Sequence, residues 1–145
     1  MAPGKVYESV VFRLGVLGAK ATELFTTRIE VYDLKPKHVG LMVVLESGGA
    51  SSQLEIARAM GVAPSLVVAL ADHLEGLRAI SRVRDPADRR RQVLTLTGRG
   101  RELLTNCAEA ARAVDAEFAP DLTEAESAVL TRLLDHLVTR LESGP

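Results

Sequence analysis

The 145-residue sequence predicts a mainly α-helical fold with one small β-hairpin, and three observations support this class. Hydrophobic residues make up 47% of the chain and aromatic residues only 3%, so the core must consist of leucine, valine and alanine, which favours helices over a β-sandwich. Apolar residues recur at spacings of three and four along most of the chain. Two short β-branched runs stand together near the middle, with the turn-forming stretch DPADRR between them.

Local signals mark four helices in the first half of the chain. Pro36 is placed to be the first residue of one helix, and Gly48 stops that helix. Ser52 and Glu55 form a capping box, in which a hydroxyl and a carboxylate satisfy the free amides of a helix start. Pro64 opens the next helix. The four helices are expected at about residues 5–32, 36–47, 52–61 and 64–77.

The second half predicts the hairpin and two long helices. Polar and apolar residues alternate along the second strand. Pro120 ends the first long helix, and a second capping box, Thr123 with Glu126, begins the other. The strands are expected at residues 80–84 and 92–96, and the long helices at about 97–118 and from 123 onward.

The order of these elements is helix, helix, short helix, helix, hairpin, helix, helix. The third and fourth helices, joined by a tight turn at Gly61, form a helix-turn-helix. The hairpin that follows directly is a wing. The sequence therefore predicts a winged helix-turn-helix in one domain, residues 1–145, which is long enough to bury its own core.

Positive charge is concentrated around the predicted hairpin, although the net charge of the protein is −1. Residues 78–101 contain eight arginines and two aspartates, a local charge of +6. Such segregation is the electrostatic footprint of a nucleic-acid-binding protein. A solvated charged loop is the alternative interpretation.

At this point the chain resembles the MarR (multiple-antibiotic-resistance-regulator) family of winged-helix transcription factors, over nearly its whole length. The segments that carry the resemblance are LKPKHVGLMVVL, QLEIARAMGV, PSLVVALADHLE and the wing segment DPADRRRQVLTLTGRGREL. The D-P-x-D-R-R wing followed by L-T-x-x-G-R is its specific part, because many helical domains imitate a helix-turn-helix alone.

The resemblance implies a triangular homodimer that binds double-stranded DNA. Residues of about 34–96 would form the DNA-binding lobe, and residues 5–32 and 97–142 the dimer base. The two lobes would sit on successive grooves of a pseudo-palindromic operator. A dimer would also cover the leucine stripe from Leu130 to Leu141, which is costly to leave exposed. An intrachain core is the alternative explanation of this stripe.

The resemblance also assigns roles in the wing. In the family, the arginine two residues after an aspartate enters the minor groove, and here that pair is Asp88 and Arg90. A narrow minor groove attracts a guanidinium by its negative potential, and Asp88 would hold the side chain by a charge-assisted bond. Arg89 and Arg91 point differently along the strand and are expected to contact phosphates. The predicted DNA surface also includes Arg82 and Arg84 on the facing strand.

The predicted recognition helix has an apolar outward face. Val68 and Ala69 stand where the family usually has polar or basic residues, and they can contact only thymine methyl groups, while Ser65 can bond a phosphate or a base. Either methyl contacts and groove shape provide the specificity, or sequence-specific binding is weak. The inward face is assigned to Val67, Leu70, Ala71 and Leu74, and the outward face to Pro64, Ser65, Leu66, Val68, Ala69, Asp72 and His73. Of these, Pro64, Ser65, Val68 and Ala69 are the predicted DNA contacts.

The end of this helix also departs from the family. A glycine commonly stands just before the first wing strand, whereas here Gly76 comes early and Arg78-Ala79 precedes Ile80. We therefore expect a shifted or distorted helix end.

Relatives often release DNA when a small phenolic or carboxylic molecule binds between the dimer base and the winged lobe. Arg13 lies within the apolar stripe of the first helix, where an unpaired charge is costly, and His38 lies near the positive end of the second. Both suit an anion such as an aromatic carboxylate. The alternatives are a salt bridge of Arg13 across the dimer and an exposed or capping role for His38.

The remaining chemistry of the sequence is sparse. Cys107 is the single cysteine, which excludes an internal disulfide, and it is expected to be a small packed residue, with redox sensing as the alternative. The three histidines, His38, His73 and His136, are far apart in the sequence, so no metal site and no cofactor are expected.

Enzyme motifs and a membrane-length apolar segment are also missing from the sequence, which favours a cytoplasmic protein without enzyme activity. The predicted function is a sequence-specific DNA-binding transcriptional regulator, a repressor released by a small aromatic or carboxylate ligand. The alternative is a winged dimer that acts as a protein-interaction module with weak or non-specific DNA binding.

Overall fold

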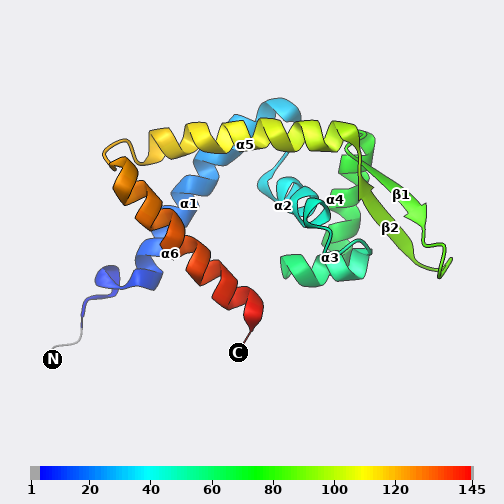
Figure 1. Cartoon of the computed structure of the whole chain (residues 1–145), viewed down its shortest axis with the longest axis horizontal. Helices are drawn as coiled ribbons and strands as arrows, with labels where there is room; N and C mark the ends of the chain where they lie inside the picture. Colours follow the sequence, from blue (N-terminus) through cyan, green and yellow to red (C-terminus); the bar gives the residue numbers. More distant parts are fainter. Residues whose placement is uncertain (1–3, 145) are drawn as a thin grey trace. The chain divides into compact units, whose positions relative to one another are not determined.

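The computed structural model describes residues 4–144, and Figure 1 shows its elements in chain order. The chain divides into two compact units, one up to Val114 and one from Asp115 onward. The first unit contains two 3-10 turns, η1 (Val6–Glu8) and η2 (Glu30–Tyr32), and the elements α1 (Val10–Ile29), α2 (Pro36–Ser47), α3 (Gln53–Met60), α4 (Pro64–Gly76), β1 (Ile80–Arg84) and β2 (Gln92–Leu96). Helix α5 (Gly98–Phe118) spans the division, and the second unit holds α6 (Glu124–Ser143).

The predicted fold class is confirmed: the structure is mostly helical with one two-stranded antiparallel hairpin. Both capping boxes form, since the Ser52 and Thr123 hydroxyls accept hydrogen bonds from the backbone N–H groups of Glu55 and Glu126. Both strands begin and end at the predicted residues. Local signals in the sequence therefore fix most of the element boundaries.

The first helix corrects a prediction, because residues 5–32 do not form one helix. Ser9 is the N-cap of α1, and its hydroxyl accepts a hydrogen bond from the Phe12 backbone N–H at 3.2 Å. Serine favours an N-cap over a helix interior because its hydroxyl competes for backbone amides. At the other end α1 stops at Ile29, and η2 leads to Asp33, whose φ of 57° is left-handed.

The core of the first unit lies among α2, α3, α4 and the hairpin, and the predicted inward face of α4 is confirmed. Between α3 and α4 the chain turns by 109°, as in a helix-turn-helix. Leu66 and His73, which were assigned to the outward face, are half-buried. The buried residues of α4 are Val67, Leu70, Ala71 and Leu74, and they belong to one cluster with Leu41, Ile56, Ile80 and Leu94.

The hairpin is bonded to the start of α3 as well as to itself. The antiparallel register pairs Ile80 with Leu96 at one end and Arg84 with Gln92 at the other. On the other side of β2, the Leu94 N–H donates a hydrogen bond to the carbonyl of residue 51 at 2.8 Å. The wing therefore projects from the helix-turn-helix as a supported hairpin (Figure 1).

The end of α4 closes with a regular pair of hydrogen bonds, whereas the missing glycine had led us to expect a shifted or distorted helix end. The Arg78 N–H donates to the Glu75 carbonyl, and the Ala79 N–H donates to the Leu74 carbonyl, both at 2.9 Å. This pair of bonds defines a Schellman motif, whose left-handed position usually holds glycine. Arg78 occupies that position with a φ of 60°.

We therefore expect Arg78→Gly to stabilise the protein by about 0.5–1 kcal/mol, because glycine removes the steric cost of a left-handed arginine at some cost in unfolded-state entropy. Chemical denaturation followed by circular dichroism measures this change. A lower stability of the variant would show that the Arg78 side chain contributes more than its backbone strain costs.

Thr97 and Gly100 lock the exit of α4 to the start of α5. The Thr97 hydroxyl donates to the Arg78 carbonyl at 2.6 Å and accepts from the Gly100 N–H at 3.0 Å. The Thr97 N–H donates to the Ala79 carbonyl, also at 3.0 Å. A Cβ on Gly100 would lie 2.1 Å from the Ala79 carbonyl oxygen, so only glycine fits there.

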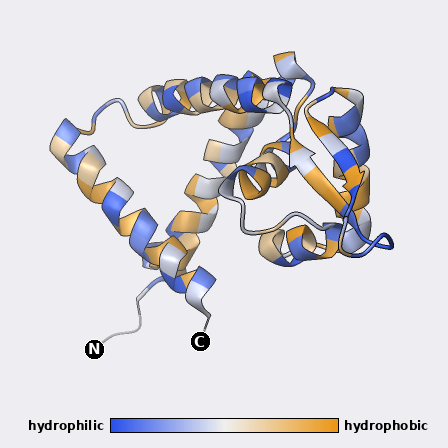
Figure 2. Cartoon of the chain, turned by 45° about the vertical axis from the view of Figure 1, so that its right-hand side comes forward, coloured by the Kyte–Doolittle hydropathy of each residue, from blue (hydrophilic) through white to orange (hydrophobic). Residues whose placement is uncertain are grey.

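The leucine face of α6 is exposed. No described residue of α6 is buried, and Figure 2 shows apolar residues recurring along this helix. The exposed stripe of α6 includes Leu130, Leu133, Leu134, Leu137, Val138 and Leu141.

Among residues 4–144 no single helix is both long and apolar enough to cross a membrane. Helices α3 and α4 reach that length and hydropathy only as a bent pair.

Candidate DNA-binding surface and effector pocket

The loop of the wing, residues 85–91, is a hydrogen-bonded turn made mostly of hydrophilic residues (Figure 2). The Asp85 N–H donates to the Arg91 carbonyl at 2.8 Å, and the Arg91 N–H donates to the Asp88 carbonyl at 2.9 Å. Both aspartate side chains accept a backbone N–H two residues on, from Ala87 at 2.9 Å and from Arg90 at 3.1 Å. Such aspartate turns stabilise a loop through its own side chains.

Arg90 lies at the free surface of this loop. Its side chain is 95% exposed, and its Nε lies 3.5 Å from Oδ1 of Asp88. The structure therefore places Asp88 beside Arg90, as expected from the sequence, and leaves the guanidinium free to reach a partner molecule. Arg84 lies in the adjacent strand, where its Nη1 donates to the Arg89 carbonyl at 3.4 Å.

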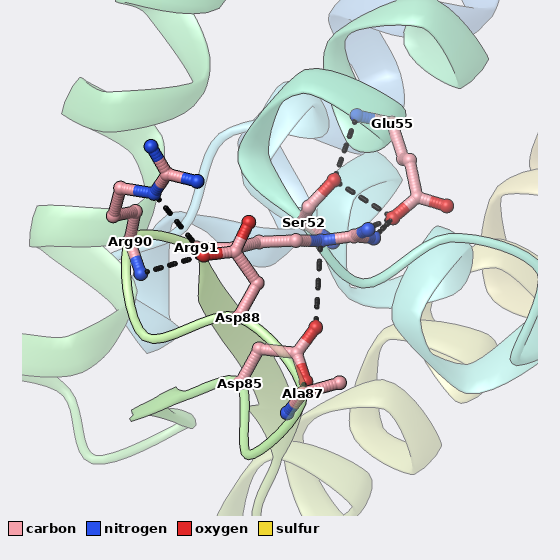
Figure 3. A network of polar contacts seen from close by, with 7 residues as sticks. All are labelled: Ser52, Glu55, Asp85, Ala87, Asp88, Arg90 and Arg91. Carbon is pink, nitrogen blue, oxygen red and sulfur yellow. Dashed lines mark hydrogen bonds and ion pairs between the residues drawn. The ribbon is translucent and has the colours of Figure 1, made fainter.

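Arg91 points to the opposite side of the loop, toward α3 (Figure 3). Its Nη2 donates to Oε1 of Glu55, and its Nε lies 3.9 Å from Oδ2 of Asp85. Glu55 is the carboxylate of the α3 capping box, so the predicted cap also serves as an ion-pair partner. Hydrogen bonds from Ser52, chiefly from its hydroxyl, lower the pKa of Glu55 and keep it charged.

Arg82 is held against the recognition helix. Its Nη2 lies 2.7 Å from Oδ1 of Asp72 and its Nη1 lies 3.5 Å from Oε1 of Glu75, both on α4. Only 19% of its side chain is exposed. The structure therefore brings Arg82 to the helix-turn-helix and not to the open surface of the wing.

The outward face of α4 has the apolar character that the sequence indicated. The four predicted contact residues of α4 are exposed, and Val68 is 40% exposed. These residues are Pro64, Ser65, Val68 and Ala69. Their contact with DNA remains a prediction.

Two histidines that are far apart in the sequence lie together in the structure. The rings of His38 and His73 stack with their centroids 4.2 Å apart. His38 is buried, and its Nδ1 accepts the Lys35 backbone N–H at 2.9 Å, which gives it the capping role. His73 donates from Nε2 to the Asp33 carbonyl at 2.6 Å, because a carbonyl can only accept.

An open pocket of about 630 Å³ lies beside the two histidines. Burial, followed by the charges of His73 and Lys35, lowers the pKa of His38 from 6.5 to about 4, so His38 is neutral at physiological pH. Lys35 and Lys37 bring positive charge to the pocket, and Glu30 and Asp33 bring negative charge. The pocket is lined by Thr26, Glu30, Asp33, Leu34, Lys35, Lys37, His38, Leu66, Ala69, Leu70 and His73.

Arg13 does not join this pocket within one chain. It is an exposed residue of α1 and lines a separate shallow groove of about 330 Å³ with apolar and aromatic neighbours. The two ligand candidates of the sequence, Arg13 and His38, are therefore not brought together in one subunit. The remaining residues of the groove are Tyr7, Phe12, Val16 and Leu17.

Cys107 is buried in the core of the first unit, and burial raises the pKa of its thiol. A buried thiol with a raised pKa forms little of the reactive thiolate. This environment supports the packing role over redox sensing. Within residues 4–144 no group of three histidine, cysteine or acidic residues could hold a metal ion.

The fold and the site together place the chain in the class of winged helix-turn-helix proteins. A family model described as the MarR family matches residues 32–91. A Thauera aromatica protein, proposed as a transcriptional regulator of the hcr operon, is 33% identical over 110 residues. This match covers 76% of the chain and 66% of the relative, just under two thirds of the relative's length. Residues 32–91 are thus similar to the MarR family, and the Thauera aromatica relative is proposed to be a transcriptional regulator.

Solved structures show the same fold. A MarR-family transcriptional regulator from Rhodococcus sp. RHA1 has a TM-score of 0.79 at 20% identity, covering 93% of this chain and 95% of that one. Bordetella bronchiseptica BpsR, whose DNA binding is regulated by 6-hydroxynicotinic acid, has a TM-score of 0.77 at 23% identity, covering 96% and 99%. At these identities the likeness concerns the fold alone.

Proposed function

We propose that the protein is a homodimeric transcriptional repressor that binds a pseudo-palindromic operator in double-stranded DNA. The observation that carries this proposal is the exposed Arg90, presented at the tip of a hydrogen-bonded wing loop in a chain that is similar to the MarR family. The exposed leucine face of α6 supports a dimer, because burial in a second subunit removes it from water. Residues of about 34–96 would form the DNA-binding lobe and residues 5–32 and 97–142 the dimer base. Such a role implies a cytoplasmic location.

On DNA, Arg90 would enter the minor groove, with Asp88 limiting the freedom of its side chain. Arg84 and Arg89 would contact phosphates and contribute affinity without sequence preference. In the major groove, α4 would read thymine methyl groups with Val68 and Ala69 and one polar atom with Ser65. Specificity would then depend on methyl contacts and minor-groove width.

Arg90→Ala should weaken binding to the protein's operator by roughly tenfold or more and reduce the salt dependence by about one counterion. Arg112→Ala is the matched control, because Arg112 is an exposed arginine of α5 outside the wing and should change binding little. Fluorescence anisotropy at several salt concentrations measures both effects. Equal losses in the two variants would refute the role of the wing tip.

The pocket beside His38 is the proposed effector site, and a small aromatic carboxylate is the proposed effector. Lys35 and Lys37 supply positive charge, and the histidine stack and apolar wall suit a flat ring. The regulation of BpsR by 6-hydroxynicotinic acid supports this ligand class. Ala69 lines the pocket and belongs to the proposed DNA-reading face, so an occupant could disturb DNA reading directly.

Adding 6-hydroxynicotinate or a similar aromatic carboxylate should release operator DNA from the wild type at lower concentrations than from Lys35→Ala. The variant removes one charge of the pocket without touching the wing. DNA release can be followed by anisotropy of a labelled operator. Release of DNA at equal concentrations from both proteins would place the effector elsewhere.

The apolar outward face of α4 also favours a second function, a winged dimer that binds a protein and binds DNA only weakly. Val68 is 40% exposed on this face, and no arginine or asparagine accompanies it there. The exposed cation at the wing tip favours DNA. A comparison of specific and scrambled DNA separates the two functions.

A further inference from the structure

We propose that Arg82 and Arg91 are positioning residues, which fasten the wing to the helix-turn-helix and make no contact with DNA. This inference rests on the proposed DNA-binding function. It revises the phosphate contact expected from the sequence for Arg91 and the place expected for Arg82 on the DNA surface. It divides the wing arginines into two groups. One group orients the wing, and the other, including Arg84, Arg89 and Arg90, faces the DNA.

The first fastening is the contact between the wing loop and α3, in which Arg91 lies between two carboxylates (Figure 3). Its Nη2 donates to Oε1 of Glu55, and its Nε lies 3.9 Å from Oδ2 of Asp85. The same Glu55 oxygen accepts the Ser52 hydroxyl at 2.7 Å, which fixes the carboxylate at the start of α3. Arg91 therefore connects the loop to a carboxylate that the capping box already holds in place.

The second fastening joins β1 to the recognition helix. Arg82 reaches Asp72 at 2.7 Å and Glu75 at 3.5 Å, two acidic residues that stand three positions apart on α4. Residues at this spacing lie on one face of a helix. The low exposure of the Arg82 side chain, 19%, contrasts with the 95% of Arg90.

The charges of these clusters argue against phosphate contacts. Each of the two arginines is paired with two carboxylates, so each cluster carries a net charge of about −1 when its acids are ionised. A phosphate would have to displace a carboxylate partner to reach either guanidinium, and the released carboxylate would then repel the DNA. Arg90 meets only the single carboxylate of Asp88 in its own loop, at 3.5 Å.

The consequence is a fixed geometry between the two DNA-reading elements. The fastenings connect the wing to α3 and to α4, the two helices of the helix-turn-helix. A wing held at one angle presents Arg90 to the minor groove while α4 enters the major groove, without an ordering cost on binding. Loss of a fastening should therefore reduce affinity while the number of phosphate contacts stays the same.

Glu55→Gln tests the α3 fastening, because glutamine can replace glutamate in a capping box but cannot form the ion pair. We would measure operator affinity and its salt dependence for the wild type, Glu55→Gln, Arg91→Ala and the double variant. Deleting one negative charge near DNA has a general effect on binding that is the same with and without Arg91. Comparing Glu55→Gln in the wild type and in the Arg91→Ala background subtracts this general effect.

If Arg91 is a positioning residue, Arg91→Ala leaves the salt dependence of binding unchanged. Glu55→Gln then weakens operator binding of the wild type roughly two- to fivefold more than it weakens binding of the Arg91→Ala variant. If Arg91 contacts a phosphate, Arg91→Ala lowers the salt dependence by about one counterion. In that case Glu55→Gln changes binding more favourably in the wild type than in the Arg91→Ala variant, because the loss of Glu55 frees Arg91 for the phosphate. Either of these last two results would overturn the proposal.

Hydrogen exchange of the free protein gives a readout that does not depend on DNA. Both Glu55→Gln and Arg91→Ala should speed exchange in the loop of residues 85–91, whose backbone N–H groups are internally bonded. Glu126→Gln is the matched control, since it alters the capping box of α6, far along the chain from the wing. Unchanged loop exchange in both variants would refute the fastening. Failure of the wild type to prefer its operator would refute the proposed function, and the exchange result would still decide the fastening.

Discussion

Replacing Gly100 with alanine should destabilise the protein by about 3 kcal/mol or more, at the upper end of what overpacking costs. The new Cβ would lie 2.1 Å from the Ala79 carbonyl oxygen and 2.7 Å from Cδ1 of Leu96. Moving this carbonyl away would disturb the hydrogen bond that it accepts from the Thr97 N–H at 3.0 Å. Relief would require α5 to separate from the exit of the recognition helix. Chemical denaturation followed by circular dichroism gives the free energy of unfolding.

Gly98→Ala is the matched control for this variant. Gly98 lies two residues earlier, at the start of the same helix, and a Cβ there would meet no atom within 4 Å. Alanine at this position should therefore leave stability unchanged or raise it, because it has the higher helix propensity. Equal stability of the two variants would show that the contact between the start of α5 and residue 79 tolerates a methyl group at position 100.

The second large effect is a loss of stability on acidification, caused by His38. Its pKa is about 4 in the native state and 6.5 as the ordinary value, so between these values the unfolded chain binds a proton that the native protein excludes. Stability should thus be full above about pH 6.5 and fall progressively toward pH 4, by up to about 3 kcal/mol. Burial is the main cause, joined by the charges of His73 and Lys35 and opposed by Asp33.

His38→Gln isolates this effect. Glutamine can still accept the Lys35 backbone N–H at the third position of the helix, so the cap is kept while the titration is lost. We expect denaturation at neutral and mildly acidic pH to show a smaller loss for this variant than for the wild type. His136→Gln, a change on the exposed α6, should retain the wild-type pH dependence. A wild-type pH dependence in His38→Gln would contradict the assignment to His38.

Elements with a local signal could be predicted from the sequence. The inward face of α4 follows from apolar spacing, and the strand ends follow from β-branched runs that flank a turn. The helix starts at residues 53 and 124 follow from their capping boxes. The break at Ser9 had a local signal of the same kind, an N-cap serine, but the apolar periodicity running through it concealed it.

Contacts between distant segments could not be predicted in this way. The stacking of His38 on His73 and the ion pair of Arg91 with Glu55 each join residues about 35 positions apart. Periodicity describes one face of one element and says nothing of which side chain meets it from elsewhere. The sequence distinguished Arg90 by its place two residues after Asp88. It could not show that acidic residues of α3 and α4 hold Arg91 and Arg82, while the Arg90 side chain is 95% exposed.

The role of Gly100 was hidden for a similar reason. The sequence showed Thr97 and Gly100 after the second strand. Position 100 requires glycine because of the Ala79 carbonyl, which directly precedes the first strand of the hairpin. Only the folded hairpin brings these two backbones together.

Fluorescence anisotropy shows whether the protein recognises a DNA sequence, when a labelled fragment from upstream of its own gene is compared with a scrambled fragment at low and moderate salt. We expect a preference for the upstream fragment that survives moderate salt, because base and groove-shape contacts remain when phosphate attraction is screened. Equal binding to both fragments, lost together as salt rises, would contradict sequence-specific recognition and leave the apolar face of α4 as a surface for a protein partner.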